Sequence, residues 1–287
     1  MAVRPNTIPC VCRCITSLEN KNRTMGANRM LHLEINASEV AKVIGANPFV
    51  DESDARRMVL RRHGVRFQDT TREEATRSQA SFVMSLVSKD LKRAAAAAAT
   101  GEEACKAVPP VERVHKVLGT GATLEQAEQV HREITSRVTQ TVGTRLEAPN
   151  VATYEATRRV KVARRQLRVS RTLPTPGGNS YTLRGKLDGY SEAEGCVEEF
   201  KNRKRRLFGM IPGYELAQLY VYMALTDSAK ARQIETFRDA QNVHHLDFDD
   251  DTWACLTGQL GEAVDRMYRV AAEAQKCAPA PKKLPPP

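Results

Sequence analysis

Two acidic residues and a lysine, spaced as neighbours on β-strands, are the part of this sequence that could do chemistry. Residues 183–189 are Leu-Arg-Gly-Lys-Leu-Asp-Gly, and residues 197–201 are Val-Glu-Glu-Phe-Lys. Side chains alternate along a strand, so Glu199 and Lys201 share one face, and a short hairpin would bring Asp188 beside them. Adjacent carboxylates repel unless a cation lies between them, and hard oxygen ligands suit Mg²⁺ or Mn²⁺. The sequence therefore predicts a divalent-metal site at this hairpin.

A lysine beside such a carboxylate pair has two chemical uses. Lys201 could lower the pKa of an attacking water, or it could stabilise charge on a phosphoryl oxygen. A Glu-x-Lys triplet is weak evidence alone, because Glu19-Asn20-Lys21 is another one. Only the triplet at Glu199 lies in a predicted strand with an Asp-Gly pair upstream. The alternative is an ordinary cross-strand pair of surface charges.

Further segments extend this pattern to a family. Asp188 followed by Glu199-Phe200-Lys201 resembles the core motif of the PD-(D/E)XK nucleases. Other segments are similar to the RecB-like branch that holds lambda exonuclease and the YqaJ-type viral recombinases. They are Ile35-Asn36-Ala37-Ser38 with Gly45-Ala46-Asn47-Pro48-Phe49, then Gly143-Thr144-Arg145-Leu146-Glu147, and Gln218-Leu219-Tyr220-Val221-Tyr222. Their order agrees with that of the family, and the resemblance covers about residues 31–250.

The resemblance implies a divalent-metal-dependent deoxyribonuclease, a phosphodiester hydrolase that digests duplex DNA ends in recombination or repair. It allows a ring-shaped trimer as an assembly. The ligands it implies for one or two Mg²⁺ (or Mn²⁺) ions are Glu147, Asp188, Glu199 and the backbone carbonyl of Phe200. Lys201 would position or activate the attacking water, and Gln218 and Tyr222 would orient the triplet or a DNA phosphate. A flap-type endonuclease and a non-catalytic DNA-binding protein on the same fold are the alternatives.

The sequence also departs from the family pattern. Leu187 stands where the family has the proline of its Pro-Asp pair, a substitution that is common across this fold. Lys186 stands where the lambda branch has a small polar residue. The tryptophan and arginine that precede the N-terminal motif of lambda exonuclease have no counterpart in residues 29–33. The resemblance therefore supplies no arginine for recognition of a 5′ phosphate.

Each motif residue has a structural interpretation as well. Gly143 could mark close backbone packing in a helix, with Glu147 on a solvated face. Gln218 and Tyr222 could belong to the exposed polar stripe of a helix. Ser38 is first of all predicted to be a helix N-cap, and its second role would be contact with a terminal phosphate, together with Lys186. The sequence alone leaves these alternatives open.

The charge of the chain favours a polyanionic partner, with nucleic acid first. The 287 residues include 44 Lys+Arg against 34 Asp+Glu, which gives a net charge of +10. Two basic runs flank the predicted metal site and predict a channel that tracks DNA phosphates. The first contains Arg158, Arg159, Arg164, Arg165 and Arg168, and the second contains Arg203, Lys204, Arg205 and Arg206. The alternative is that both runs are solvated faces.

Composition excludes several other classes of protein. No apolar run approaches the roughly 20 residues needed to cross a bilayer, and the first residues lack the apolar core of a secretory signal. We therefore expect an intracellular protein without a membrane partner. Residues 1–30 form a basic tail that also fits a mitochondrial transit peptide, and a nuclear location is open too. The seven cysteines are irregularly spaced, which predicts reduced thiols and no iron–sulfur cluster.

Periodicity predicts the elements that must position these residues. Helices are expected at residues 38–44, 51–63, 72–99, 212–226 and 249–275, and Gly101 is expected to stop the third of these. A further long helix is expected to begin at a capping box formed by Thr123 and Gln126 and to lead into Gly143. Strands are expected at residues 160–169, 181–188, 196–201, 232–238 and 243–248. The predicted fold is one α/β domain over residues 31–276. It has a restriction-endonuclease-like mixed sheet from residues 160–248, flanking helices and a helical N-terminal part. Residues 277–287 are a proline-rich tail.

Overall fold

The structure is a computed structural model that describes residues 31–67 and 72–277. Its strands are β1 (Leu33–Asn36), β2 (Arg168–Pro174), β3 (Ser180–Lys186), β4 (Gly189–Ser191), β5 (Cys196–Asn202), β6 (Lys230–Phe237) and β7 (Ala240–Asp247). Its helices are η1 (Ala37–Glu39), α1 (Val40–Val43), α2 (Glu52–Arg62), α3 (Arg72–Leu86), α4 (Ser88–Ala97), α5 (Gly101–Cys105), α6 (Val111–Leu118), α7 (Leu124–Arg158), α8 (Gly213–Thr226) and α9 (Asp250–Cys277). Within these ranges no helix combines the length and apolar character that a membrane span requires. The predicted tails, 1–30 and 277–287, lie outside the described residues apart from Cys277.

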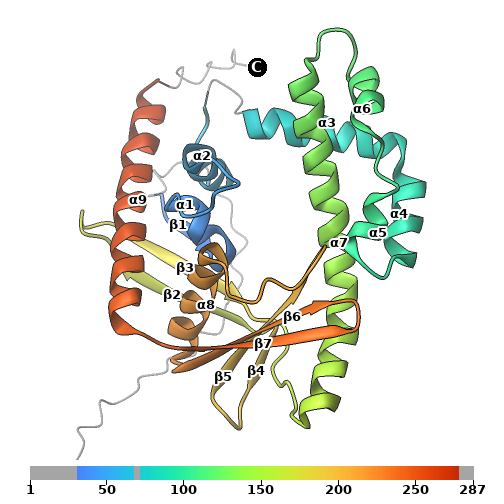
Figure 1. The fold of residues 1–287 in the computed structure, drawn as a ribbon. Helices are drawn as coiled ribbons and strands as arrows, with labels where there is room; N and C mark the ends of the chain where they lie inside the picture. The colour runs from blue at the N-terminus through green and yellow to red at the C-terminus, as the bar shows by residue number, and fades with distance from the viewer. Residues whose placement is uncertain (1–30, 68–71, 278–287) are drawn as a thin grey trace, which may run out of the picture. The chain divides into compact units, whose positions relative to one another are not determined.

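The strands form two mixed sheets with helices beside them (Figure 1). The first has the order β1-β3-β2, with β1 parallel to β3, and the second has the order β4-β5-β6-β7, with β5 parallel to β6. The predicted α/β class with a mixed strand arrangement is confirmed. The prediction of a single sheet from residues 160–248 is wrong, because the pairing divides the strands and β1 comes from the N-terminal part. Leu33 and Ile35 are fully buried and alternate with Glu34, but β1 is too short to stand out in the sequence.

The chain passes from one sheet to the other at Leu187 and Asp188. β3 ends just before these residues, and β4 begins just after them with Gly189, which pairs with Glu198 of β5. No strand was predicted between residues 188 and 196, so the three-residue strand β4 was missed. The β4–β5 hairpin nevertheless carries Asp188 to the middle of β5, as the strand alternation predicted.

Helix α7 is longer than its sequence pattern indicated. The predicted capping box is present, since the Thr123 hydroxyl accepts from the backbone N–H of Gln126 and the Gln126 side chain accepts from the N–H of Thr123. The helix then continues through Gly143 and Pro149 for 35 residues in all. Packing overrides these breakers, because Val151 and Tyr154 in the last turns are buried. This extension carries residue 147 to the edge of β5.

Helices α3 to α6 pack on the N-terminal half of α7 around a core of their own. The predicted helix over residues 72–99 is wrong, because α3 and α4 are separate elements. Gly101 does not stop a helix but begins α5. Thr100 is the N-cap of α5, and its hydroxyl accepts from the N–H of Glu103, whose carboxylate accepts from the N–H of Ala99.

The segment between α7 and β2 is irregular, although period-two alternation predicted a strand from residue 160. Ala163 forms an isolated bridge with Tyr190, and regular pairing begins only at Arg168. Arg164 and Gln166 have positive φ angles of 43° and 60°, which no strand residue adopts. The first basic run therefore lies on a helix end, a connection and the start of β2 instead of on one strand.

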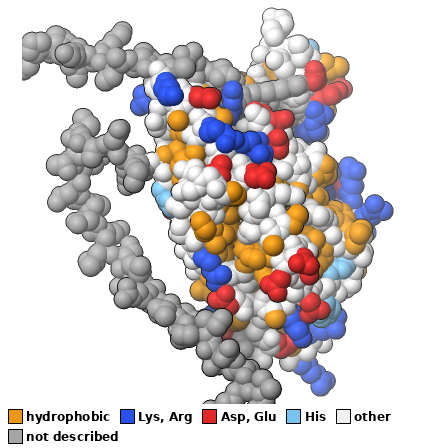
Figure 2. Space-filling model, turned by 90° about the vertical axis from the view of Figure 1, so that its left-hand side faces the viewer, with side chains coloured by type: hydrophobic (Ala, Val, Ile, Leu, Met, Phe, Trp, Pro, Cys, Tyr) orange, Lys and Arg blue, Asp and Glu red, His pale blue; other side chains and the backbone are white. Residues whose placement is uncertain are grey.

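The main apolar core lies between the first sheet and helices α1, α2, α8 and α9. Leu183, Leu219, Met223 and Leu260 are fully buried in it, and burial of each such side chain contributes about 1.5–3 kcal/mol. Figure 2 shows the face on the α9 side, where acidic and basic side chains lie mixed among hydrophobic ones. The excess positive charge is therefore not concentrated in one continuous patch on that face.

Candidate active site

Asp188, Glu199 and Lys201 lie together at the junction of the two sheets. Oδ2 of Asp188 accepts from the backbone N–H of Phe200 at 3.0 Å. Nζ of Lys201 donates to Oε1 of Glu199 at 2.6 Å. The two carboxyl groups come together because Asp188 accepts from the residue that follows Glu199, and Glu199 is only 3% exposed. The structure thus brings together the carboxylate pair and the lysine that the strand alternation predicted.

The electrostatics of this group show an unbalanced charge. Burial, and then the charge of Glu199, raise the pKa of Asp188 to about 7, although the N–H of Phe200 and the ammonium of Lys201 oppose the rise. Burial disfavours the charge of Lys201, but the carboxylate of Glu199 outweighs it, so the pKa of Lys201 is raised. Oε2 of Glu199 is buried and has no hydrogen-bond partner among the described residues. A cation between the two carboxylates would stabilise the ionised form of Asp188 and would give Oε2 of Glu199 a partner.

Gln218 and Tyr222 of α8 complete the group. Nε2 of Gln218 donates to Oε1 of Glu199 at 3.1 Å and to the hydroxyl of Tyr222 at 2.8 Å. Nζ of Lys201 donates to Oε1 of Gln218 at 3.2 Å, and the Tyr222 hydroxyl donates to the carbonyl of Lys186 at 3.1 Å. Both α8 side chains therefore face the site and do not form an exposed stripe.

Tyr222 imposes a requirement on the neighbouring strand. Tyr222 is 4% exposed, and an added Cβ at Gly185 of β3 would lie 2.8 Å from its Cε1 atom. Real Cβ atoms do not approach so closely, so β3 needs glycine at this position to let the ring pass. Burial, the first cause, and the nearby charge of Glu199 raise the pKa of Tyr222, so its hydroxyl stays protonated and donates.

Glu147 of α7 adjoins the pair but is held by other residues. Burial, followed by the charge of Asp188, raises the pKa of Glu147, so the two carboxyl groups interact electrostatically. Oε1 of Glu147 accepts from Nε2 of Gln166 at 2.8 Å and from Nη2 of Arg165 at 3.5 Å.

Gly143 lies one helical turn before Glu147 on α7. The side chain of Asn202 donates to the carbonyl of Gly143 at 2.6 Å. An added Cβ on Gly143 would make only ordinary contact, so close packing does not require this glycine.

Two of these residues, Asp188 and Glu199, are placed to bind a divalent cation. Asp188 and Glu199 offer adjacent carboxylates, one with a raised pKa and the other with an oxygen that has no partner. In the ranges that the structure describes, no three His, Cys, Asp or Glu side chains are grouped closely enough for a preassembled metal centre. Glu147 would join Asp188 and Glu199 as a ligand only after a local adjustment. The donor set, all oxygen, suits Mg²⁺ or Mn²⁺.

Arg203 does not lie on a DNA-facing surface, and its prediction as a DNA contact is wrong. It is 8% exposed, and its guanidinium donates to both carboxylate oxygens of Glu215 at 2.7 and 2.9 Å and to Glu235 at 2.7 Å. The same group lies 4.0 Å from the ring centre of Phe208. No local pattern indicates this pairing, because the acidic partners come from α8 and β6. Of the same run, Arg205 and Arg206 are exposed and Lys204 is partly buried.

The first basic run is placed around the site in several ways. Arg158 ends α7, and Arg159 follows it as the C-cap, both exposed. Arg164 forms an ion pair with Glu192, and Arg165 forms its ion pair with Glu147. Arg168 is exposed on β2. Of these cations, Arg165 contacts Glu147 directly, and two of them, Arg164 and Arg165, already have acidic partners.

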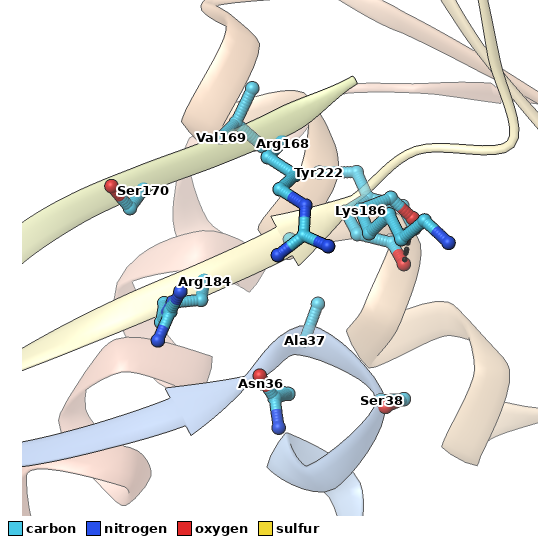
Figure 3. Close-up of a pocket in the computed structure, with 10 residues that line it drawn as sticks. Asn36, Ala37, Ser38, Arg168, Val169, Ser170, Arg184, Lys186 and Tyr222 are labelled. Atoms are coloured by element: carbon cyan, nitrogen blue, oxygen red, sulfur yellow. Dashed lines mark hydrogen bonds between the residues drawn. The ribbon is translucent and has the colours of Figure 1, made fainter. Parts of the chain in front are cut away.

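A basic cavity of about 400 Å³ lies beside the group (Figure 3). It is lined by Asn36, Ala37, Ser38, Arg168, Val169, Ser170, Arg184, Gly185, Lys186 and Tyr222. Figure 3 shows the guanidinium of Arg168 extending from β2 toward the turn that carries Ala37 and Ser38. Ser38 and Lys186, which we predicted from the sequence to contact a terminal phosphate together, thus line the same cavity. Arg184 was missed, although alternation places it on the same face of β3 as Lys186.

Ser38 is not a helix N-cap, and that prediction is wrong. Asn36 precedes the first helical turn, where its backbone N–H donates to Oε2 of Glu39 at 3.0 Å. Ser38 lies inside the 3₁₀ turn η1 and is exposed. The competing signal is Asn36-x-x-Glu39, which has the spacing of a capping box two residues earlier.

Comparison with known proteins gives structural likenesses only. No family model and no curated protein matches the chain. An alkaline exonuclease from Laribacter hongkongensis matches with a TM-score of 0.48 and 12% identity, over 85% of this chain and 92% of that one. A phage-related exonuclease from Haemophilus somnus 129PT matches with a TM-score of 0.41 and 13% identity, over 86% and 99%. SSO0001 matches with a TM-score of 0.36 and 16% identity, and this chain covers 63% of its length. At such low TM-scores and identities, the activities of those proteins are not transferred to this chain.

Proposed function

We propose that this chain is a divalent-metal-dependent deoxyribonuclease that digests duplex DNA from its ends. The observation that carries the proposal is the pair of Asp188 and the buried Glu199, which lies against the charged Lys201 and leaves one carboxylate oxygen without a partner. A structural ion pair would satisfy both carboxylates. A pair that leaves one unsatisfied is suited to bind a cation and to act on a phosphodiester.

Each residue of the group has a role in such a reaction. Asp188, Glu199 and the carbonyl of Phe200, with Glu147 beside them, would hold a divalent cation, which supplies charge neutralisation at the phosphate and activation of water. Lys201 keeps its proton because Glu199 raises its pKa, so its ammonium stabilises negative charge on the phosphoryl group in the transition state. Gln218 holds Oε1 of Glu199 in place and is itself fixed by Tyr222.

The charge around the group supports DNA as the substrate. The chain carries a net charge of +10, and Arg168, Arg184 and Lys186 line the cavity next to Tyr222. Such a cluster of cations recognises phosphates without regard to base sequence. Arg205 and Arg206 on the connection between β5 and α8 add exposed positive charge near the end of β5. These groups would guide the sugar–phosphate backbone into the site.

The basic cavity fits a terminal phosphate, and we expect duplex DNA with a 5′ phosphate to be degraded faster than duplex with a 5′ hydroxyl. Lys186→Ala should erase this difference more than it slows the hydroxyl substrate, because it removes a cation from the cavity lining. The measurement is the initial rate on the two substrates. Arg171→Ala, on the same strand as Arg168 but outside the lining, is the control that keeps the preference. Equal rates of wild type on both ends would contradict this role of the cavity.

The proposed activity is tested by digestion of end-labelled linear duplex and covalently closed circular DNA with Mg²⁺. We expect progressive loss of the linear substrate from its ends, no cutting of the circle and no digestion in EDTA. Cutting of closed circles at a comparable rate would favour the endonuclease alternative. Binding without cleavage in Mg²⁺ or Mn²⁺ would overturn catalysis and leave a DNA-binding protein.

A further inference from the structure

The connection between α7 and β2 has an unusual backbone. Among the described residues other than glycine, five have positive φ, and three of them, Arg159, Arg164 and Gln166, lie in this short connection at 54°, 43° and 60°. Side chains with a Cβ disfavour this region, where glycine or asparagine is the usual choice. Strain of this kind persists where the surrounding structure or the function requires it.

Gln166 is the one of these three whose side chain contacts the candidate active site. Its Nε2 donates to Oε1 of Glu147 at 2.8 Å. Arg165 donates to the same oxygen at 3.5 Å, from a side chain that is 38% exposed. No hydrogen bond to Oε2 of Glu147 is found in the part of the chain that the structure describes. One oxygen of the carboxylate is held, and the other is available to a ligand.

The backbone around Gln166 is tied to the strand that leads into Asp188. The N–H of Leu167 donates to the carbonyl of Arg164 at 3.3 Å, which closes a turn around Gln166. The N–H of Leu187 donates to the carbonyl of Leu167 at 2.9 Å. The turn is thus anchored one residue before Asp188, while the Gln166 side chain reaches Glu147. Gln166 therefore links Glu147, through its side chain, to the segment that carries Asp188, through the backbone of its neighbour Leu167.

We propose that Gln166 is a positioning residue that holds the carboxylate of Glu147 through Oε1 beside the Asp188–Glu199 pair, so that a local adjustment brings the free Oε2 to the divalent cation. This inference rests on the proposed function of the same site. Carboxylates that bind metals are commonly held by hydrogen bonds from neighbouring groups, and loss of such a partner lowers metal affinity by about 10- to 100-fold. The contact depends on the length of the Gln166 side chain, because its terminal carboxamide is the group that reaches Oε1 of Glu147.

The experiment measures Mn²⁺ binding to the full chain by calorimetry, with no DNA present. Gln166→Gly removes the carboxamide and relieves the positive φ, so we expect Mn²⁺ affinity to fall by about 10- to 100-fold while the melting temperature is unchanged or higher. A structural role alone predicts the reverse, a lower melting temperature with unchanged affinity. Gln166→Asn tolerates the same φ but is one methylene shorter, and it should also weaken Mn²⁺ binding.

The matched control is Asp227→Gly, which relieves a φ of 53° at the end of α8 without touching Glu147. Its Mn²⁺ affinity should equal that of wild type. If Gln166→Gly and Gln166→Asn bind Mn²⁺ like wild type while Glu199→Gln does not, the positioning role is overturned and the proposed function stands. If wild type binds no Mn²⁺, or binds it independently of Glu199, both are overturned.

Discussion

Two clusters of charged side chains lie near the C-terminal end of β5, and they differ in how their charges are satisfied. The closed cluster consists of Arg203, Glu215 and Glu235 with Gln233 and His244, and every carboxylate oxygen in it accepts a hydrogen bond. The open cluster consists of Asp188, Glu199 and Lys201, and it leaves Oε2 of Glu199 without a partner. Complete pairing stabilises a fold, whereas an unpaired carboxylate oxygen next to a second carboxylate is suited to bind a cation.

The pKa values of the two clusters shift in opposite directions. Burial alone would raise the pKa of Glu235, but hydrogen bonds from His244, Arg203 and the backbone N–H groups of Phe208 and Gly209 lower it to about 2. In the open cluster, burial and the charge of a second carboxylate raise the pKa of Asp188 to about 7. A carboxylate removed from solvent is therefore a stable anion where donors are plentiful and a proton-binding group where they are lacking.

The largest expected effect is on catalysis, from changes in the open cluster. Glu199→Gln and Lys201→Ala should each reduce DNA cleavage by about 10²- to 10³-fold or more, because they remove a metal ligand and a charge that acts in the transition state. The Glu199→Gln variant should remain folded, because removal of the repulsion with Asp188 offsets the loss of the ion pair with Lys201. Glu19→Gln, in the other Glu-x-Lys triplet, is the control and should cleave normally. Full activity of both site variants would exclude the open cluster from the chemistry.

Next in size is the loss of stability when the closed cluster is broken. Arg203→Met should lower the free energy of unfolding by about 3–5 kcal/mol, because it leaves Glu215 and Glu235 buried without their cation. Chemical denaturation of the variant and wild type measures the difference. Arg93→Met, whose side chain is 83% exposed in wild type, should change stability by less than about 0.5 kcal/mol. Weaker DNA binding at unchanged stability would instead return Arg203 to the DNA surface.

The clusters should also respond oppositely to pH in the presence of EDTA. The pKa of Glu235 is lowered from 4.5 to about 2, so its contribution is complete above pH 4.5 and is lost as the pH falls toward 2. That contribution is at most about 3 kcal/mol. The pKa of Asp188 is raised from 3.8 to about 7, so its contribution is lost as the pH rises through that interval. Unfolding free energies from pH 2 to 8 test this, with Glu235→Gln and Asp188→Asn each flattening its own interval.

The sequence was more informative about the open cluster than about the closed one, for a geometric reason. Asp188, Glu199 and Lys201 meet through strand alternation and one hairpin, which are local patterns. Arg203 follows the end of β5 and Glu235 lies on β6, 32 residues further along the chain, and nothing local indicates that they pair. A basic run next to a metal site therefore suggested DNA contact for a residue that is buried.

The same distinction applies to the fold. The helices α2, α8 and α9 follow from apolar periodicity and caps, and the predicted ranges agree with the structure to within a few residues. β1 and β4 were missed because strands of four and three residues carry too little alternation to be recognised. The contact of Gln166 with Glu147 involves a residue with a positive φ angle, and a glutamine in a sequence does not indicate such an angle.

The smallest expected effect concerns cations that face solvent, in contrast to the buried Arg203. Neutralising Arg164, Arg165 and Arg168 together should weaken DNA binding on every sequence and flatten the slope of log K against log salt by about 0.9 per lost phosphate contact. Arg164 and Arg165 already pair with Glu192 and Glu147, so we expect Arg168, which lines the basic cavity, to account for most of the change. Binding is measured in the Glu199→Gln background so that cleavage does not interfere. An unchanged slope would remove all three arginines from the DNA interface.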